Sequence, residues 1–227
     1  MHRLNNLWIT IAWLRCKQRY YQRKIQHNTN AQALKTCWQN GIKPIQNRKN
    51  ITKGEIEFLV ADLEMSSLDK NEGEIISIGW VVIKHRKIQL ASAEHHLLKA
   101  QNSVGQSATI HNLRDCELQQ GQSLHNVMER FLTIAAGKIL VFHHAPLDKA
   151  YLNQASMKLY GSPLLLPTID TLAIEKQKLM HQQEHIKTGE LRLAECRSRY
   201  NLPAYPAHNA LMDALSAAEL LLAQLKP

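Results

Sequence analysis

The sequence predicts an α/β fold in which helices flank a mixed β-sheet, with a basic helical arm ahead of the sheet. Three observations carry this prediction. Three β-rich runs follow one another closely enough to pair as a meander. Two short apolar runs come next, each followed by a helical pattern, which adds further strands and places helices on the sheet. The third observation is charge: all 19 Asp and Glu lie in residues 54–227, whereas 11 of the 28 Lys and Arg lie in residues 1–53.

The uneven charge separates the arm from the body. The formal net charge of +9 divides into +11 for residues 1–53 and −2 for residues 54–227. This division excludes a uniformly basic nucleic-acid-binding surface, and a body so close to neutrality is too apolar to be disordered. We therefore expect an arm with a linker over 1–53 and one domain over 54–227.

The arm is expected to begin with an amphipathic helix. Its apolar residues recur three or four apart, and the helix should fade near 27–30. They are Leu4, Leu7, Trp8, Ile11 and Leu14. Their stripe should pack on the body or on a partner, while the basic face is either solvated or in contact with nucleic-acid phosphates. Residues 40–54 are rich in turn formers and indicate the linker.

The period of the apolar residues predicts the elements of the body. Strands are expected at 56–63, 75–83, 87–98, 139–142 and 164–166. Helices are expected at 124–136, 146–159, 171–187, 190–199 and 209–225.

Cysteine spacing and hydropathy bear on the compartment. Four cysteines stand far apart with no CxxC pair, which indicates reduced thiols and neither a disulfide framework nor a zinc site. The longest apolar run, 7–14, contains Thr10 and is too short to cross a bilayer. We expect no membrane association and a cytoplasmic location of the bacterial type. Because an acid-free, Arg-bearing N-terminus is also typical of transit peptides, mitochondrial targeting is the alternative.

Two carboxylates end the first predicted strand. Asp62 and Glu64 stand two residues apart, so they share one face of the strand with Cα atoms about 6.6 Å apart. Neighbouring anions repel unless cations neutralise them, and hard divalent ions such as Mg²⁺ or Mn²⁺ commonly do so. A solvated strand end is the alternative interpretation.

A third carboxylate, Asp148, lies on an apolar helix stripe. The stripe also contains Tyr151, Leu152, Ala155 and Leu159. An acid in that position must be paired, metal-bound or at the open edge of the stripe, because an uncompensated buried charge is unfavourable. The alternative is a first-turn charge that complements the helix dipole.

His208 and Asp213 surround the start of the last predicted helix. Asn209 is a suitable N-cap, which would place His208 just ahead of the helix and near Asp213. A neutral imidazole can remove a proton from water, although a lone histidine in such a position is usually structural. Together the three segments supply the four carboxylates and one imidazole that metal-assisted phosphodiester hydrolysis requires.

These segments resemble the motifs of a known family. DLE at 62–64, HHAPLDKAYL at 143–152 and HNALMDA at 208–214 resemble, in this order, the exonuclease motifs of the DEDDh family. That family includes the proofreading epsilon subunit of bacterial DNA polymerase III. Further matches are EIISIGWVVI at 74–83, IH at 110–111 and IDTLAI at 169–174. The resemblance spans about 58–225 and leaves the arm outside it.

The resemblance implies a ribonuclease H-like fold, a five-stranded mixed sheet whose first three strands are antiparallel. It implies that Asp62, Glu64, Asp148 and Asp213 hold two divalent metal ions, Mg²⁺ or Mn²⁺, and that His208 is the general base. It also implies that substrate-binding residues line the 3′-terminal nucleotide. These are Leu63, Met65, His111 and His143.

The implied activity is 3′–5′ exonucleolytic hydrolysis of single-stranded or frayed DNA, releasing nucleoside 5′-monophosphates. RNA is the alternative substrate, as for relatives of the ribonuclease T or oligoribonuclease type. A different class of function is a binding subunit whose arm docks on a polymerase or another partner.

The sequence departs from the family's motifs at some positions. Family members often have Thr-Thr-Gly after the glutamate, where this chain has Met65-Ser66-Ser67. His144 and Leu147 stand where Asn and Phe are common.

Overall fold

The computed structural model describes residues 5–42, 56–67, 69, 73–99, 120–182, 185–206 and 208–226. The strands are β1 (Phe58–Met65), β2 (Ile75–Lys84), β3 (Lys87–Leu97), β4 (Ile139–Phe142) and β5 (Thr168–Asp170). The helices are α1 (Asn5–Lys24), η2 (Thr29–Ala31), α2 (Gln32–Ile42), α6 (Leu124–Ala135), α7 (Ala145–Tyr160), α8 (Thr171–Gln182), α9 (Leu193–Ser198) and α10 (Ala210–Gln224).

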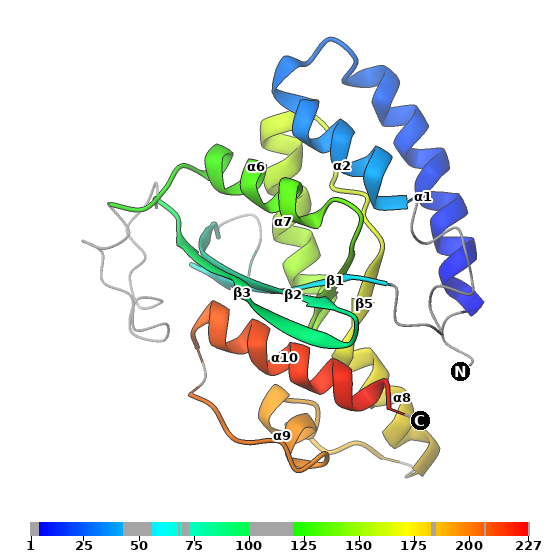
Figure 1. The fold of residues 1–227 in the computed structure, drawn as a ribbon, viewed down its shortest axis with the longest axis vertical. Coiled ribbons are helices and arrows are strands. Elements are labelled where there is room, and N and C mark those ends of the chain that lie inside the picture. The colour runs from blue at the N-terminus through cyan, green and yellow to red at the C-terminus, as the bar shows by residue number, and fades with distance from the viewer. Residues whose placement is uncertain are drawn as a thin grey trace.

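The strands form a five-stranded mixed sheet in the order β3-β2-β1-β4-β5. β1 pairs antiparallel with β2, and β2 antiparallel with β3, while β4 runs parallel to both β1 and β5. Helices α6 and α7 lie on one side of the sheet, and α10 lies on the other with α8 and α9 beside it (Figure 1). The predicted fold class is confirmed.

The two faces of β1 serve two different parts of the core. Leu59, Ala61 and Leu63 belong to the larger apolar cluster on the side of α6 and α7. Val60 points the other way and packs with Leu221 and other apolar residues of α10. Because side chains alternate along a strand, Asp62 and Glu64 continue the face that α10 covers.

One predicted strand was misplaced. The apolar run 164–166 is not a strand, and the fifth strand is Thr168–Asp170 instead. Leu164 and Leu166 are buried in the same core cluster as Leu34 and Trp38 of the arm. Apolar character alone does not distinguish a buried strand from a buried connection, which explains the error. The predicted helices 171–187 and 190–199 are shorter than expected, ending at Gln182 and Ser198.

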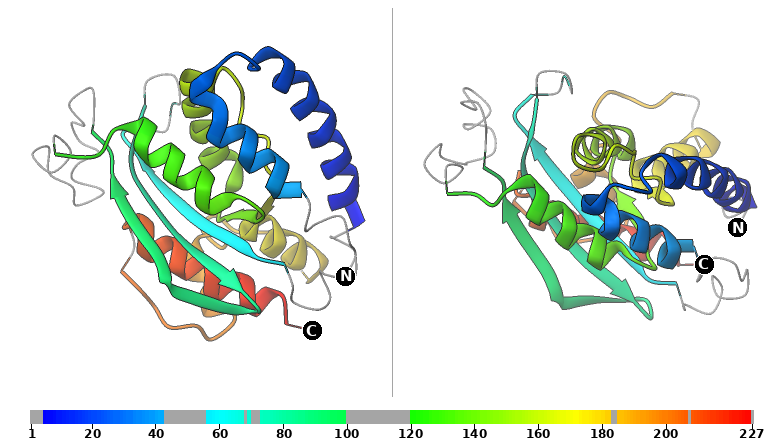
Figure 2. Two further views of the ribbon diagram at one scale, coloured as in Figure 1. Left: turned by 45° about the horizontal axis from the view of Figure 1, so that its top comes forward. Right: turned by 90° about the horizontal axis from the view of Figure 1, so that it is seen from above.

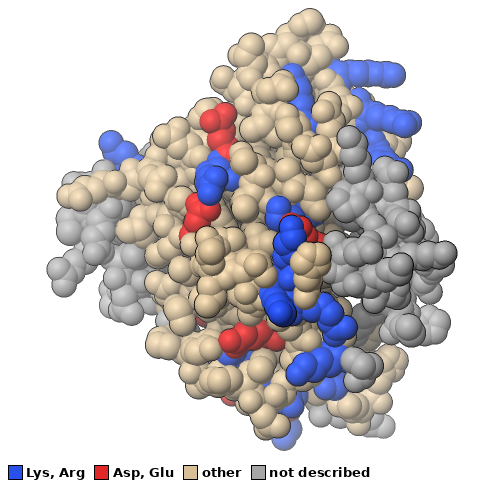
Figure 3. Space-filling view, viewed as in Figure 1, with Lys and Arg blue, Asp and Glu red and all other residues tan. Residues whose placement is uncertain are grey.

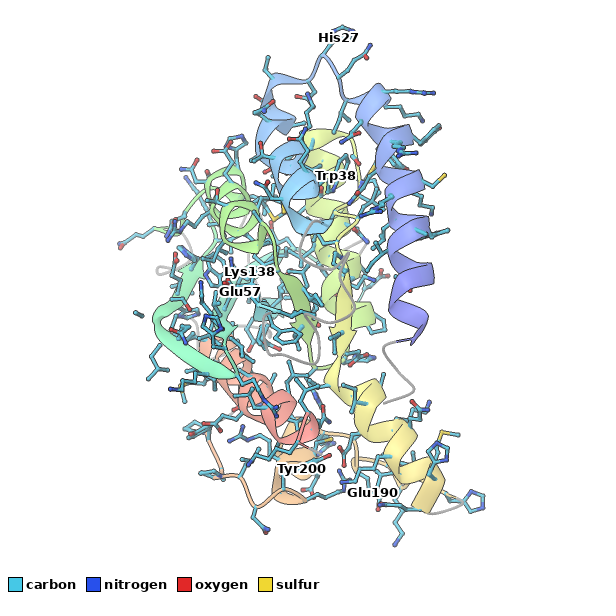
Figure 4. The ribbon with its side chains drawn as sticks, turned by 45° about the vertical axis from the view of Figure 1, so that its right-hand side comes forward. His27, Trp38, Glu57, Lys138, Glu190 and Tyr200 are labelled. Carbon is cyan, nitrogen blue, oxygen red and sulfur yellow. The ribbon has the colours of Figure 1, made fainter. Side chains whose placement is uncertain are left out.

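The arm packs against the body through two helices, of which only the first was predicted. Ile11 and Leu14 of the predicted stripe are buried, as are Leu34 and Trp38 of α2. The indole Nε1–H of Trp38 donates a 2.6 Å hydrogen bond to the carbonyl of Leu164. Figure 2 shows both arm helices on the side of the sheet that α6 and α7 cover, and Figure 4 shows Trp38 on α2.

Two further hydrogen bonds hold the arm to the last residue of α7 and to the connection after it. Gln18 Nε2 donates to the carbonyl of Leu165 at 2.8 Å, and Asn28 Nδ2 donates to the carbonyl of Tyr160 at 3.0 Å. The side chains of Leu4, Leu7 and Trp8 and most of the predicted linker 40–54 lie outside the described residues. Within the described part of the chain, no helix is both long and apolar enough to cross a membrane.

Candidate active site

The carboxyl end of β1 carries the first two carboxylates. In the β1–β2 ladder Asp62 lies opposite Gly79, and Glu64 lies opposite Ser77. Ser77 is buried, and its hydroxyl is 2.7 Å from the Nε2 atom of His95. The ladder shifts register directly after Glu64, so the regular strand pairing ends beside the site.

Asp213 reaches the same place from the first turn of α10. Asn209 is the N-cap, and its side-chain oxygen accepts a 3.1 Å hydrogen bond from the Met212 N–H. One oxygen each of Asp62, Glu64 and Asp213 lie within 4.8 Å of one another. Residues 62 and 213, far apart in the chain, are therefore joined in one carboxylate cluster.

Gly79 makes this approach possible. A Cβ atom added at Gly79 would overlap the backbone of Ala210 and Leu211 at the start of α10. The missing side chain lets the helix backbone lie directly against β2, across from Asp62. Sequence reasoning did not identify this residue as functional, although a glycine inside an apolar strand is the pattern that indicates such a close approach.

Asp148 adds a fourth carboxylate from the first turn of α7. It is 5% exposed, so it does not lie at an open edge of the apolar stripe. Burial raises the pKa of Asp148 to about 8, and hydrogen bonds from its own backbone and that of Leu63 oppose this rise. Asp148 stands outside the group of three whose oxygens are within 4.8 Å, yet its charge is the first of those that raise the pKa of Asp62.

The pKa values of the other three carboxylates are raised as well. Burial, followed by the charges of Asp148, Asp213 and Glu64, raises the pKa of Asp62 well above its ordinary value. Burial and the charge of Asp213 raise the pKa of Glu64 to about 7. The pKa of Asp213 is also raised by burial, against hydrogen bonds from the backbone of His208 and Asn209. Four acids in these surroundings would be stabilised by cations, and an all-oxygen donor set suits hard divalent ions.

His208 lies at the edge of the cluster, just ahead of α10 as expected. Its backbone N–H donates a 2.9 Å hydrogen bond to Oδ2 of Asp213, and its side chain is exposed. The residue has a φ of 67°, in the left-handed region that residues other than glycine seldom adopt. The turn therefore orients the Asp213 carboxylate with the backbone while leaving the imidazole on the solvent side.

The predicted substrate-binding residues are in different situations. Leu63 and Met65 are buried on β1 beside the carboxylates. Both ring nitrogens of His143 are engaged within the protein, Nδ1 with the Thr171 hydroxyl and Nε2 with the Leu191 carbonyl, each at 2.9 Å. This pairing gives His143 a structural role between β4 and α8, and its contact with substrate stays a prediction. His111 lies outside the described residues.

His144 occupies a left-handed conformation with a φ of 80° as the N-cap of α7. Its backbone N–H donates to Oδ1 of Asp170 at 3.0 Å. Asparagine tolerates this region better than most residues, which gives a physical reason for its frequency at this position in the family that the sequence resembles.

Arg197 is a second residue that sequence reasoning missed. Its guanidinium is buried and donates to the carbonyls of Ser216 and Pro203 at 2.6 and 2.7 Å. It also donates to Oε2 of Glu219 at 2.7 Å. These bonds tie α9 and the following segment to α10, and that segment leads to His208. No periodic pattern in the sequence indicates a buried arginine.

Comparison with known proteins agrees with this geometry. The family model described as Exonuclease, RNase_T, matches residues 59–221. The DNA polymerase III PolC-type protein of Thermotoga maritima is 30% identical over 172 residues, which are 75% of this chain and 12% of that protein. A DNA polymerase III subunit epsilon-like protein of Rhodobacter capsulatus is 25% identical over 74% of this chain and 23% of its own length. The chain thus spans a small part of these relatives.

Solved structures share the fold. The cell-death related nuclease CRN-4 superimposes with a TM-score of 0.60 at 16% identity, covering 74% of this chain and 63% of that one. The zinc-bound E. coli ExoI–ssDNA complex superimposes with a TM-score of 0.63 at 13% identity, covering 74% and 40%. The family match includes every carboxylate of the cluster and the histidine beside it. The chain belongs to the RNase_T family of exonucleases.

Proposed function

We propose that this exonuclease domain hydrolyses single-stranded or frayed DNA from the 3′ end and releases nucleoside 5′-monophosphates. The observation that carries the proposal is the cluster of Asp62, Glu64 and Asp213, with Asp148 buried beside it and His208 at its edge. Buried acids whose pKa values are raised together are characteristic of functional sites.

Two divalent cations, Mg²⁺ or Mn²⁺, fit the donor set. Asp62, Glu64 and Asp213 would hold one, and Asp62 with Asp148 would hold the second. When bound, the cations stabilise the attacking and leaving oxygens of an in-line displacement. The raised pKa values of Asp62, Glu64 and Asp148 support this assignment, because bound cations would remove the repulsion from neighbouring acids that contributes to them.

Side-chain and backbone groups of this chain would take the proton of the attacking water and hold the carboxylates in position. The imidazole of His208, which is exposed, would take a proton from the attacking water. The backbone N–H of His208 and the N-cap Asn209 fix the first turn of α10 and so the position of Asp213. Gly79 holds that turn against β2. The backbone of Leu63 and Met65 would contact the terminal nucleotide, because the side chains of both residues belong to the core cluster on the side of α6 and α7.

DNA is proposed over RNA because the related proteins include DNA polymerases of the PolC type and a fold neighbour crystallised with single-stranded DNA. Exoribonuclease activity is the alternative, since 2′-hydroxyl contacts can come from any backbone group.

We also place the protein in a reducing, cytosol-like compartment, which the free thiols of Cys16, Cys37 and Cys196 support.

The test uses 5′-labelled oligonucleotides of matched DNA and RNA sequence with Mg²⁺ or Mn²⁺. The unsubstituted protein should shorten the DNA stepwise from its 3′ end, whereas Asp62→Asn and Asp213→Asn should each abolish shortening. Glu195→Gln, which removes an exposed acid on α9, is the matched control and should keep full activity. Full activity of both cluster variants would contradict the proposal. Faster shortening of RNA than of DNA would support exoribonuclease activity instead.

Association with a polymerase is a second candidate, favoured by the PolC-type relatives, in which the matched part is 12% of a much longer protein. Docking through residues 1–53 cannot be tested by deleting them, because Trp38 and Leu34 belong to the core. Co-elution with a purified DNA polymerase should instead be compared between the unsubstituted chain and variants of the exposed face of α1.

A further inference from the structure

Helix α1 presents an aromatic–basic stripe that consists of Trp13, Lys17, Tyr20 and Lys24. These residues stand three or four apart, so they lie on one face of the helix. Trp13 is 53% exposed and Tyr20 is 55% exposed. Large aromatic side chains normally bury most of their surface, so two neighbouring exposed rings need an explanation.

Each ring of the stripe is paired with a lysine of the next turn. Lys17 Nζ lies 4.0 Å from the ring centre of Trp13, and Lys24 Nζ lies 4.7 Å from that of Tyr20. The stripe therefore alternates flat π surfaces with cationic groups at helical spacing. Proteins bind single strands through this combination, because bases stack on aromatic rings while lysines meet the phosphates.

The charge around the stripe has one sign. The described arm carries no acid, and none of the ion pairs between described residues uses a cation of α1. Exposed Arg19 and Arg23 add to the positive surface on the flank of the helix. Figure 3 shows Lys and Arg side chains projecting together where α1 lies. This is charge complementary to a polyanion.

The buried face of α1 distinguishes between nucleic acid and a phospholipid surface as the polyanion that the helix binds. A basic amphipathic helix binds lipid by burying its apolar face in the bilayer. On that side Ile11 and Leu14 of α1, and Ile25 just after the helix, are at most 5% exposed. Ile11 and Ile25 belong to the protein's own core clusters. The helix is thus committed to the body, and only the aromatic–basic side remains for a partner. Bases have faces that stack on Trp13 and Tyr20, which phospholipid headgroups lack.

We infer that the aromatic–basic stripe binds single-stranded nucleic acid, holding a part of the strand away from the end that reacts. α1 lies at the opposite side of the body from the first turn of α10, where the carboxylates cluster (Figure 1). Only a strand long enough to reach both places would gain from the stripe. The inference rests on the proposed function for the identity of the strand, whereas the binding itself can be measured without catalysis.

The test measures fluorescence anisotropy of a 5′-fluorescein oligothymidylate of about 30 nucleotides, longer than the roughly 4–16 that one single-strand-binding fold covers. The full chain is used in EDTA, so that no strand is cut. Trp13→Ala/Tyr20→Ala should weaken binding at least about tenfold, because stacking on one ring accounts for that much. Lys17→Gln/Lys24→Gln should reduce the slope of log K against log salt by about 1.4, since each phosphate contact on a single strand contributes about 0.7.

Two control pairs keep the result specific to the stripe. Leu90→Ala/Met180→Ala removes exposed apolar side chains elsewhere, and Lys158→Gln/Lys176→Gln removes exposed lysines of α7 and α8. Both controls should bind the long strand as the unsubstituted chain does. Cleavage of an oligonucleotide of about four nucleotides, too short to reach a second surface, should be the same in all variants.

Unchanged affinity and salt slope in both stripe variants would overturn the inference, and so would an equal loss in the control pairs. Failure of the unsubstituted chain to cleave even the short strand would contradict the proposed function instead. The binding result in EDTA would stand in that case, so the two failures are distinguishable.

Discussion

The backbone N–H of His208 donates a 2.9 Å hydrogen bond to Oδ2 of Asp213, five residues further along the chain. The candidate base and a candidate metal ligand are therefore joined through the main chain. A side-chain substitution at His208 can remove the ring without removing the bond that orients Asp213.

His208→Asn separates these two roles. Asparagine tolerates the left-handed φ of 67°, so the turn and the orientation of Asp213 should persist. Without the imidazole, kcat should fall by about 10²–10⁴, the range typical of a lost general base, while Mn²⁺ affinity stays the same. Single-turnover kinetics and calorimetric Mn²⁺ titration measure the two effects. An unchanged kcat would remove His208 as the base.

Gly79→Ala should separate α10 from β2. The added methyl group overlaps the backbone of Ala210 and Leu211, and overpacking of this kind costs about 1–3 kcal/mol of stability. Because the displaced turn carries Asp213, cation affinity and activity should fall together. Urea unfolding and Mn²⁺ titration provide the readouts. Ser77→Ala, on the same face of β2 but without added volume, is the control and should keep cation affinity; a normal Gly79→Ala protein would contradict the positioning role.

The cation-free protein should lose stability as pH rises. The pKa of Glu64 is about 7 and that of Asp148 about 8 in the fold, against about 4 in an unfolded chain. A raised pKa contributes stability that is fully present below the unfolded value and is lost as pH increases through the folded value. In EDTA the Tm should therefore be lower at about pH 8.5 than at about pH 5.5, and Mg²⁺ should raise it at the higher pH.

Asp148→Asn identifies the source of that pH dependence. The amide cannot ionise, so the variant in EDTA should have a higher Tm than the unsubstituted chain at about pH 8.5 and a similar one at low pH. Differential scanning calorimetry at both pH values measures the difference. A variant that is less stable at high pH would show that the Asp148 carboxylate stabilises the fold. Glu195→Gln should leave both curves unchanged.

Trp38→Ala should destabilise the whole protein although the residue lies in the arm. Trp38 is 1% exposed and donates to the Leu164 carbonyl, so its loss opens a cavity and leaves a buried acceptor. Removing such a side chain costs about 3–5 kcal/mol. Denaturant unfolding measures the loss, with exposed Trp13→Ala as the matched control within about 0.5 kcal/mol of the unsubstituted chain. Equal stability of the two variants would show that the arm packs only loosely.

The sequence alone determined what depends on neighbours in the chain. Alternation along a strand placed Asp62 and Glu64 on one face, and the helical stripe singled out Asp148 as an acid on an apolar face, where it is 5% exposed. Asn209 as the N-cap and His208 ahead of the helix also follow from local capping chemistry. The order of three short motifs was specific enough to indicate the family.

The tertiary structure alone decided what depends on contacts between distant segments. The arm's second helix was missed, and the strand at 164–166 was misplaced, because the burial of Leu164 depends on Trp38 from far along the chain. The meeting of Asp213 with Asp62 depends on the Cβ that Gly79 lacks, and the segment before His208 depends on the buried Arg197. Periodicity reports which face of an element is apolar, but not which other element will cover it, because that choice is made by packing across the sheet.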